Sequence, residues 1–272
     1  MIKLTSVKEA SFDEMELPKT LYKYRKWNDE YHKKILTRRE VYFARPTSFE
    51  DKYDCKIPIR YDLLTDRDIY NHYLFDSKKK NEDWSRQQHR DYARKWAKKS
   101  LIKNEKFVQN KQKIEFEEYD ACIGILSLTA DIYNIDMWAN YSDNNKGFAV
   151  GFDPLIMFPF LGGGGPVIYY NVLPIIYPYP KHLYEEQIHL QKYSKLKKWE
   201  FEKEYRTQLF RPYPMNDSVR TIQIPPNAFK EIILGANMDE NVIEDLIKSI
   251  PIELINVPIK QARMVNGNIE IH

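Results

Sequence analysis

The chain has 272 residues, of which 43% are hydrophobic and 14% aromatic, and its formal net charge is +3. These values are typical of a folded domain with a sizeable core and exclude a disordered chain. With only two cysteines, the sequence excludes a disulfide framework and favours a reducing compartment. The N-terminal residues lack a basic segment followed by an apolar run, and no apolar run approaches a membrane-spanning length of about 18 residues. We therefore expect a cytoplasmic protein that has no membrane partner.

The N-terminal part is predicted to contain short strands around one helix. Residues 21–27 are typical of a strand, and residues 28–39 of a helix with Asn28 as its N-cap. Residues 40–46 then return as a strand, and a polar and aromatic loop follows at 47–55.

A long polar stretch from about residue 64 to 118 has a helical pattern. Residues 77–113 within it contain 13 Lys or Arg but only 4 Asp or Glu, so the positive charge is concentrated there and the rest of the chain is acidic. We interpret residues 61–118 as a helical insertion within a single α+β domain of residues 1–272.

The strongest helical segment of this insertion, residues 82–107, carries a basic stripe. Four residues spaced four apart place it on one helix face: Arg86, Arg90, Arg94 and Lys98. An aromatic arc lies roughly opposite and consists of Trp84, Tyr92, Trp96 and Phe107. This arrangement predicts a helix that docks by its aromatic face and leaves the basic stripe in water. Contact between the stripe and a nucleic acid stays open as the alternative.

Strand patterns dominate the remaining sequence. They occur at 122–129, 147–153, 166–172, 202–209, 231–235, 252–257, 259–265 and 268–272, with helical patterns at 181–198 and 239–250. This irregular mixture predicts an α+β fold with a mostly antiparallel sheet. The glycine-rich segment 162–166 precedes a strand, whereas a phosphate-binding loop precedes a helix, so we expect a flexible hairpin tip there.

Two polar residues end the strand at 122–129. Ser127 and Thr129 alternate onto the same face of that strand, and the short helix after it carries Trp138. One interpretation is that Trp138 covers a sheet edge. The other is that Ser127, Thr129 and Trp138 line a cavity.

The strand expected from Glu202 to Leu209 places three charged side chains on one face. Glu202, Glu204 and Arg206 alternate there, close to Trp199. Three interpretations are open: a solvated face, an ion pair that supports the sheet, and a functional site. Neither face of this strand is plainly apolar, so an acid buried here needs a partner, and Arg206 is the natural one.

The sequence shows no metal-ligand spacing among its six histidines and no Gly-x-Ser-x-Gly motif. We therefore expect neither a bound metal nor a serine hydrolase. A metal-dependent nuclease stays open only through a set of acids, namely Asp51, Asp54, Glu202 and Glu204.

Four segments together resemble a bacterial family known only as domain of unknown function 2971. They are LYKYR, VYFARPTSFEDKYDC, SLT…MWANYSDNNKGFAVGFD, and the pattern W-x-x-E-x-E-x-R at Trp199, Glu202, Glu204 and Arg206. The chain departs from the family pattern at Asn140 and Asn145, where the family has histidine, and at Glu50, Asp51 and Lys52, where it has Asn-Asp-Pro.

The order of motifs is also similar to that of arginine-class ADP-ribosyltransferases. Those enzymes have an Arg on an early strand, a Ser-x-Ser/Thr on a middle strand and a Glu-x-Glu on a later strand, and this chain has Arg25, Ser127-Leu128-Thr129 and Glu202-Lys203-Glu204. The similarity implies an enzyme that uses NAD, as a transferase or an NAD glycohydrolase. Such an enzyme would suit a toxin or a phage-defence effector.

The same similarity implies roles for individual residues. Glu204 would be the catalytic carboxylate, and Glu202 would orient the acceptor. The implied NAD-binding residues are Arg25, Ser127, Thr129, Trp138 and Arg206, with Arg25 on the diphosphate. The alternative from a different class is a non-enzymatic module that binds a nucleic acid or a protein through the helix at 82–107.

Overall fold

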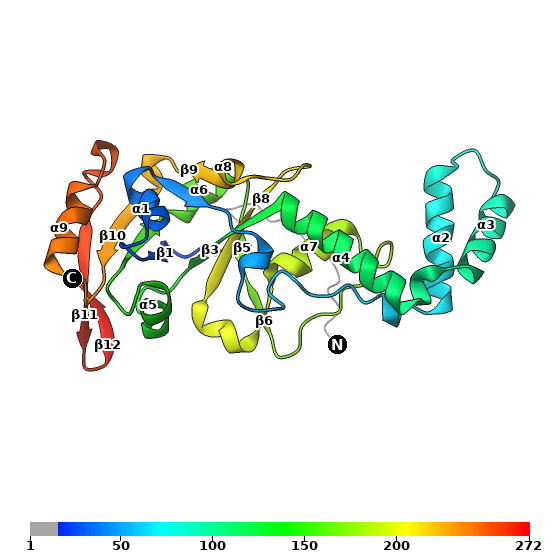
Figure 1. The fold of residues 1–272 in the computed structure, drawn as a ribbon, viewed down its shortest axis with the longest axis horizontal. Coiled ribbons are helices and arrows are strands. Elements are labelled where there is room, and N and C mark those ends of the chain that lie inside the picture. Colours follow the sequence, from blue (N-terminus) through cyan, green and yellow to red (C-terminus); the bar gives the residue numbers. More distant parts are fainter. Residues whose placement is uncertain (1–15) are drawn as a thin grey trace.

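The computed structural model describes residues 16–272, so most of the N-terminal segment in which we expect no targeting sequence lies outside the described range. At its centre is an eight-stranded sheet with the order β12-β11-β10-β4-β1-β3-β8-β5 (Figure 1). Its strands are β1 Leu21–Arg25, β3 Ile123–Thr129, β4 Phe148–Phe152, β5 Gly165–Pro166, β8 Glu204–Phe210, β10 Phe229–Leu234, β11 Ile259–Val265 and β12 Asn268–Ile271. All neighbours pair antiparallel except β10 and β11. The predicted α+β class with a mostly antiparallel sheet is confirmed.

Helices and two small sheets surround this central sheet. The small sheets pair β2 Glu40–Tyr42 with β9 Thr221–Gln223, and β6 Ile168–Tyr170 with β7 Ser194–Leu196. The α-helices of the described chain are α1 Glu30–Thr37, α2 Asp66–Lys80, α3 Arg86–Lys98, α4 Glu105–Cys122, α5 Ile135–Tyr141, α6 Pro154–Leu161, α7 Tyr184–Tyr193, α8 Asp217–Arg220 and α9 Glu240–Lys248. None of them combines the length and the apolar character needed to cross a membrane.

Both faces of the sheet are covered, because alternate strand residues enter two different hydrophobic cores. On one face, α1, α6 and α9 bury Leu36, Phe158 and Leu246 against β4 and β10. On the other face, α5 inserts Trp138, whose ring packs edge-on against Tyr24 of β1 at a centroid distance of 4.9 Å. The centre of the sheet is therefore buried on both faces.

The contact between β1 and β3 is short. These strands are neighbours in the sheet, yet they pair at a single position, Tyr22 with Thr129. By contrast, β3 pairs with β8 along its whole length, from Ile123 to Thr129. The sheet is thus continuous on either side of the β1–β3 boundary and weakly joined at it.

The helices α2, α3 and α4 form the polar helical part, and α2 and α3 project from the rest of the molecule as a hairpin beyond one end of α4 (Figure 1). Thr65 and Ser85 start α2 and α3 with reciprocal capping boxes. A buried hydrogen bond of 2.9 Å between Ser77 Oγ and His89 Nδ1 joins the two helices. The hairpin is therefore a defined element and not a flexible linker.

The aromatic arc of the basic helix does not dock as we predicted. Trp84 and Trp96 remain 37% and 41% exposed, and Phe107 lies on α4 instead of α3. Instead, α3 buries Ala93 and His89. Ala93 is small enough for a close approach of the two helices, and His89 is held in their contact by its hydrogen bond to Ser77.

The glycine-rich segment is not a hairpin tip. It follows α6, and Gly162 ends that helix with a left-handed backbone (φ 83°). A left-handed residue after a helix is typically glycine because no Cβ opposes it. Gly165 then starts β5, which pairs with β8.

Three smaller predictions are also wrong. Asp29, and not Asn28, caps α1, and its carboxylate accepts hydrogen bonds from two backbone N–H groups of the first turn. The predicted helix at 181–198 ends at Tyr193, where β7 begins. The predicted strand at 252–257 is a single 3₁₀ turn that follows a proline.

Candidate active site

A cleft of about 290 Å³ opens at the weak boundary between β1 and β3. One wall is formed by β1 and includes Lys23 and Arg25. The opposite wall is formed by the start of β8 together with η5, a 3₁₀ helix at Lys197–Glu202, and includes Glu202 and Glu204. Thus the cleft lies where the sheet can accommodate a ligand without losing many backbone hydrogen bonds.

The backbone places both glutamates on the same cleft, although they do not share a strand. The predicted strand from Glu202 is wrong, because Glu202 ends η5 and β8 begins at Glu204. Lys203 between them has a left-handed backbone (φ 42°), which reverses the chain direction locally. The hydroxyl of Thr129 donates to the Glu202 carbonyl oxygen at 2.6 Å and so holds this turn against β3.

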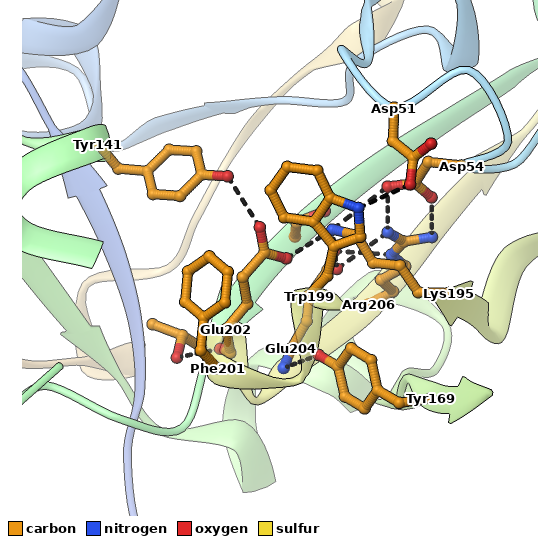
Figure 2. Close-up of polar contacts among 12 residues, drawn as sticks. Asp51, Asp54, Tyr141, Tyr169, Lys195, Trp199, Phe201, Glu202, Glu204 and Arg206 are labelled. Atoms are coloured by element: carbon orange, nitrogen blue, oxygen red, sulfur yellow. Dashed lines mark hydrogen bonds and ion pairs between the residues drawn. The ribbon is translucent and has the colours of Figure 1, made fainter. Parts of the chain in front are cut away.

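Lys195 binds three carboxylates at the floor of the cleft (Figure 2). Its Nζ lies 2.5 Å from Glu202 Oε2, 3.1 Å from Glu204 Oε2 and 3.3 Å from Asp54 Oδ2. All four side chains are buried. Charges in such surroundings interact strongly, so the ammonium and the carboxylates fix one another in place.

Arg206 binds two carboxylates of the same network from beneath the cleft. Its Nε and Nη2 donate to the two oxygens of Glu204 at 2.6 and 2.9 Å, and Nη2 also donates to Asp54 Oδ2 at 2.8 Å. The guanidinium is 1% exposed and does not line the cleft. Arg206, which we expected to bind NAD, is therefore a support that holds Glu204 and Asp54.

The two glutamates differ in their pKa values. Burial raises the pKa of Glu202, and the attraction of Lys195 offsets this only in part. Burial would also raise the pKa of Glu204, but Arg206 and Lys195 together outweigh it and hold that pKa well below its usual range. Two neighbouring carboxyls whose pKa values are pushed apart are the usual arrangement for acid–base chemistry.

The wall formed by β1 presents cations. Lys23 Nζ reaches across the β1–β3 boundary and donates to the Ser127 carbonyl oxygen at 2.6 Å, and Arg25 donates only to the Tyr24 carbonyl oxygen at 3.4 Å. Burial and the nearby Arg25 lower the pKa of Lys23 to about 7, and burial lowers the pKa of Arg25 to about 10. Within residues 16–272, neither side chain has a carboxylate at ion-pair distance, although Glu204 and Glu202 attract Lys23 and Asp29 attracts Arg25 from further away.

Aromatic side chains border the acidic wall. The Tyr141 hydroxyl donates to Glu202 Oε1 at 2.8 Å, and Trp199 Nε1 donates to Asp51 Oδ2 at 2.7 Å (Figure 2). The Trp199 ring also lies over Lys195, with its centroid 5.2 Å from Nζ. These rings supply flat apolar surface next to charged groups, which is the usual composition of a small-molecule site.

The structure brings together five of the predicted site residues. They line one cleft and are Arg25, Ser127, Thr129, Glu202 and Glu204. Trp138 does not join them: it is fully buried, and its indole N–H donates to the Ile132 carbonyl oxygen at 2.7 Å. It therefore packs in the core beneath α5, but against the central strand β1 and not against a sheet edge as the first interpretation had it.

The basic stripe is separate from the cleft. Its residues are exposed on α3 in the projecting hairpin, and none lines the cleft: Arg86, Arg90, Arg94 and Lys98. The cleft and the stripe are thus two independent surfaces.

Asn140 and Asn145, which replace histidines of the family pattern, do not line the cleft either. Asn145 ends a turn in which Asp143, Asn144 and Asn145 all have left-handed backbones, with φ of 55°, 52° and 66°. Asn and Asp are the non-glycine residues that tolerate this conformation best. The turn itself therefore explains the asparagine at 145.

Among the cleft residues that sequence reasoning missed are Lys23, Lys195 and Tyr141. A signal existed for Lys23, because it lies two positions before Arg25 on the same strand. No signal existed for Lys195, which comes from the short strand β7 and meets Asp54 from a distant loop.

No group of three His, Cys, Asp or Glu side chains in the described chain is arranged to hold a metal ion. The acids of the nuclease alternative are engaged by other partners: Asp54, Glu202 and Glu204 contact Lys195, and Asp51 accepts from Trp199. The nuclease alternative stays a prediction that this geometry does not favour.

Comparisons of the chain with family models, with curated proteins and with solved structures give no match. The resemblance to domain of unknown function 2971 and the analogy to ADP-ribosyltransferases therefore stay predictions.

Proposed function

We propose that the cleft binds NAD and breaks the bond between nicotinamide and ribose, so that ADP-ribose passes to an acceptor or to water. One observation carries this proposal: the cations Lys23 and Arg25 and the carboxylates Glu202 and Glu204 line one cleft. NAD has the matching charges, because its diphosphate is anionic and its pyridinium ring is cationic.

The order of the strands supports the same proposal. The three segments of the ADP-ribosyltransferase-like pattern lie on β1, on β3 and at the start of β8, and these strands are consecutive neighbours in the sheet. Ser127 and Thr129 pair with Arg206 and Glu204 across β3 and β8. Segments that are more than 170 residues apart in the chain, at Arg25 and Glu202, thus meet at one place.

The pKa values of the two glutamates suit different roles. Glu204 stays ionised and opposes the positive charge that develops on the ribose as the glycosidic bond breaks. Nicotinamide leaves with the electron pair of that bond, and the attacking water or acceptor hydroxyl forms the new bond to the same carbon. Glu202, with its raised pKa and its contact to Tyr141, accepts the proton that this nucleophile loses.

Incubation of the full chain with NAD tests the proposal, with free nicotinamide measured by chromatography. We expect nicotinamide to form at a rate proportional to protein concentration, with ADP-ribose either free or attached to an acceptor. An acceptor-dependent enzyme still shows slow hydrolysis by water, so a long incubation at high protein concentration without any nicotinamide contradicts the proposal.

A second candidate function rests on the α2–α3 hairpin. The basic stripe is exposed on an element that projects from the body, which is a suitable shape for contact with a nucleic acid. We propose it as a non-enzymatic role that does not depend on the cleft.

A further inference from the structure

A second cavity, of about 660 Å³, lies next to the cleft, and Arg25 lines both of them. Its other walls come from α1, from β2 and from α8, and it is the larger of the two cavities. The cleft alone, at about 290 Å³, is at the lower limit of ordinary ligand pockets. A ligand as long as a dinucleotide needs more room than that.

Two cations, Lys23 and Arg25, lie close to the place where the two cavities adjoin. Lys23 and Arg25 are two residues apart on β1, and within the described chain neither has a carboxylate partner at ion-pair distance. Their mutual repulsion appears in the lowered pKa of Lys23, for which burial is the larger cause. A partly buried cation without a partner is costly, so a bound anion would stabilise both side chains.

The geometry of these two cations suits phosphate. A guanidinium is a planar fork that binds two phosphate oxygens at once, whereas an ammonium acts as a compact point charge. Two adjacent cations match the two adjacent charges of a diphosphate. A single carboxylate would satisfy only one of them.

The second cavity has surfaces for a nucleoside. Tyr31 and Tyr42 provide aromatic rings, with the Lys34 ammonium over one face of Tyr31 at 4.8 Å from the centroid, and Ile35 and Val41 provide aliphatic surface. Asp217 lines the same cavity and accepts a hydrogen bond from the Tyr42 hydroxyl at 2.9 Å. Aromatic faces stack with a base, and a carboxylate accepts hydrogen bonds from ribose hydroxyls or from an exocyclic amine.

We infer that Lys23 and Arg25 hold the diphosphate of a nucleoside diphosphate, and that the second cavity takes its nucleoside, with the base against Tyr31. This inference rests on the proposed function in one respect, because it places the nicotinamide ribose of the same ligand in the cleft. It adds a second binding subsite and a second phosphate-binding residue, Lys23.

Titration calorimetry of the full chain tests the inference with two ligands, ADP and inorganic pyrophosphate. Three variants are compared with the wild type. Lys23→Gln removes one of the two cations, Tyr31→Ala removes the aromatic face, and Lys26→Gln removes a nearby lysine that lines neither cavity. Tyr31 is 80% exposed, so its truncation leaves the fold intact. Circular dichroism verifies folding for each variant.

We expect Lys23→Gln to lower the affinity for both ligands about tenfold, because both contact Lys23 through phosphate. Tyr31→Ala should weaken ADP about tenfold and leave pyrophosphate unchanged, since only ADP carries a base. Lys26→Gln should change neither. Three results would each overturn the inference. The chain does not bind ADP, or Tyr31→Ala changes the affinity for both ligands equally, or Lys23→Gln leaves the affinity for ADP unchanged.

The two proposals fail in different ways. ADP has no nicotinamide, so its binding does not depend on any reaction. A chain that binds ADP as predicted but never releases nicotinamide from NAD contradicts the proposed function and leaves the nucleoside diphosphate site intact. A chain that releases nicotinamide, but whose affinity for ADP is the same in the wild type, Lys23→Gln and Tyr31→Ala, contradicts the inference alone.

Discussion

Glu202 and Glu204 are neighbours in the sequence and in the cleft, yet their partners give them different properties. Glu202 has Lys195 and the Tyr141 hydroxyl, whereas Glu204 is bound by both Lys195 and Arg206. Burial raises the pKa of Glu202, whereas Arg206 and Lys195 hold the pKa of Glu204 well below its usual range. The two side chains therefore need separate tests.

Glu202→Gln should keep the fold and lower the rate of nicotinamide release by about 10² to 10⁴, the usual range for loss of a general base. The amide keeps the size of the side chain and its contact to Tyr141 but cannot accept the proton. The matched control is Glu200→Gln, two residues earlier on the same 3₁₀ helix, because Glu200 is exposed and does not line the cleft. Equal rates for the two variants would remove Glu202 from the mechanism.

Arg206→Met should destabilise the protein by about 3 to 5 kcal/mol, because it leaves two buried carboxylates, Glu204 and Asp54, short of a partner. Urea unfolding measures this change, and Arg86→Met on the exposed face of α3 is the control, expected to stay within about 0.5 kcal/mol. The folded-state pKa of Glu204 is lowered, so its contribution is present at neutral pH and is lost as the pH falls below the ordinary carboxyl range. A small effect of Arg206→Met would show that the network is not needed for folding.

The lowered pKa of Lys23 predicts that ligand binding depends on pH. Its pKa of about 7 results from burial and from Arg25, while Glu204 and Glu202 oppose the shift and Arg206 adds to it. A bound diphosphate favours the protonated amine, so affinity should be highest below the pKa and fall about tenfold from about pH 6 to about pH 8.5. ADP-ribose is a suitable ligand because its diphosphate keeps the same charge over this range. An affinity that is flat with pH, or equal in wild type and Lys23→Gln, would contradict this role.

Among the elements, the hairpin of α2 and α3 has the clearest independent surface. Changing Arg86, Arg90, Arg94 and Lys98 to Glu should abolish any binding of nucleic acid, and the wild-type affinity should fall steeply with salt. Fluorescence anisotropy with a labelled oligonucleotide measures both. Nicotinamide release should be unchanged, because the stripe does not line the cleft. Binding that is insensitive to salt, or that survives the reversal, would contradict a role for the stripe.

The sequence predicted elements well where their pattern is local. The strands at β1, β3, β4, β11 and β12 follow from strand patterns between turn signals, and the polar helical pattern from about residue 64 to 118 corresponds to α2, α3 and α4. The prediction of a strand from Glu202 failed because Lys203, which has a left-handed backbone, interrupts the single strand that the alternating pattern predicts. The prediction for the aromatic arc also failed, because packing between α2 and α3 is decided by Ala93 and His89.

The cleft could be predicted only in part. Arg25, Ser127, Thr129, Glu202 and Glu204 share it, and their chain order pointed to one site. Lys195 and Asp54 could not be anticipated, because their contact depends on how β7 and a distant loop pack together. The side of the sheet on which Trp138 lies, and hence its place in the core, is likewise a tertiary property.

At the scale of the whole molecule, the proposed site lies at the β1–β3 boundary, where the sheet is weakly joined. The single pairing of β1 with β3 opens the cleft, and the cleft meets the second cavity at Arg25. The strand order brings β1, which carries Lys23 and Arg25, near the start of β8, where Glu204 lies with its partners Lys195 and Arg206. A ligand with one cationic end and a central diphosphate is the chemistry that this layout fits.

A crystal structure of the full chain with a carbocyclic NAD analogue, whose bond to nicotinamide does not break, tests the central claim most directly. The account predicts density with the nicotinamide ribose against Glu202 and Glu204, the diphosphate on Lys23 and Arg25, and the adenosine against Tyr31. A structure in which the analogue lies elsewhere, lies in the opposite direction, or fails to bind at saturating concentration would contradict it.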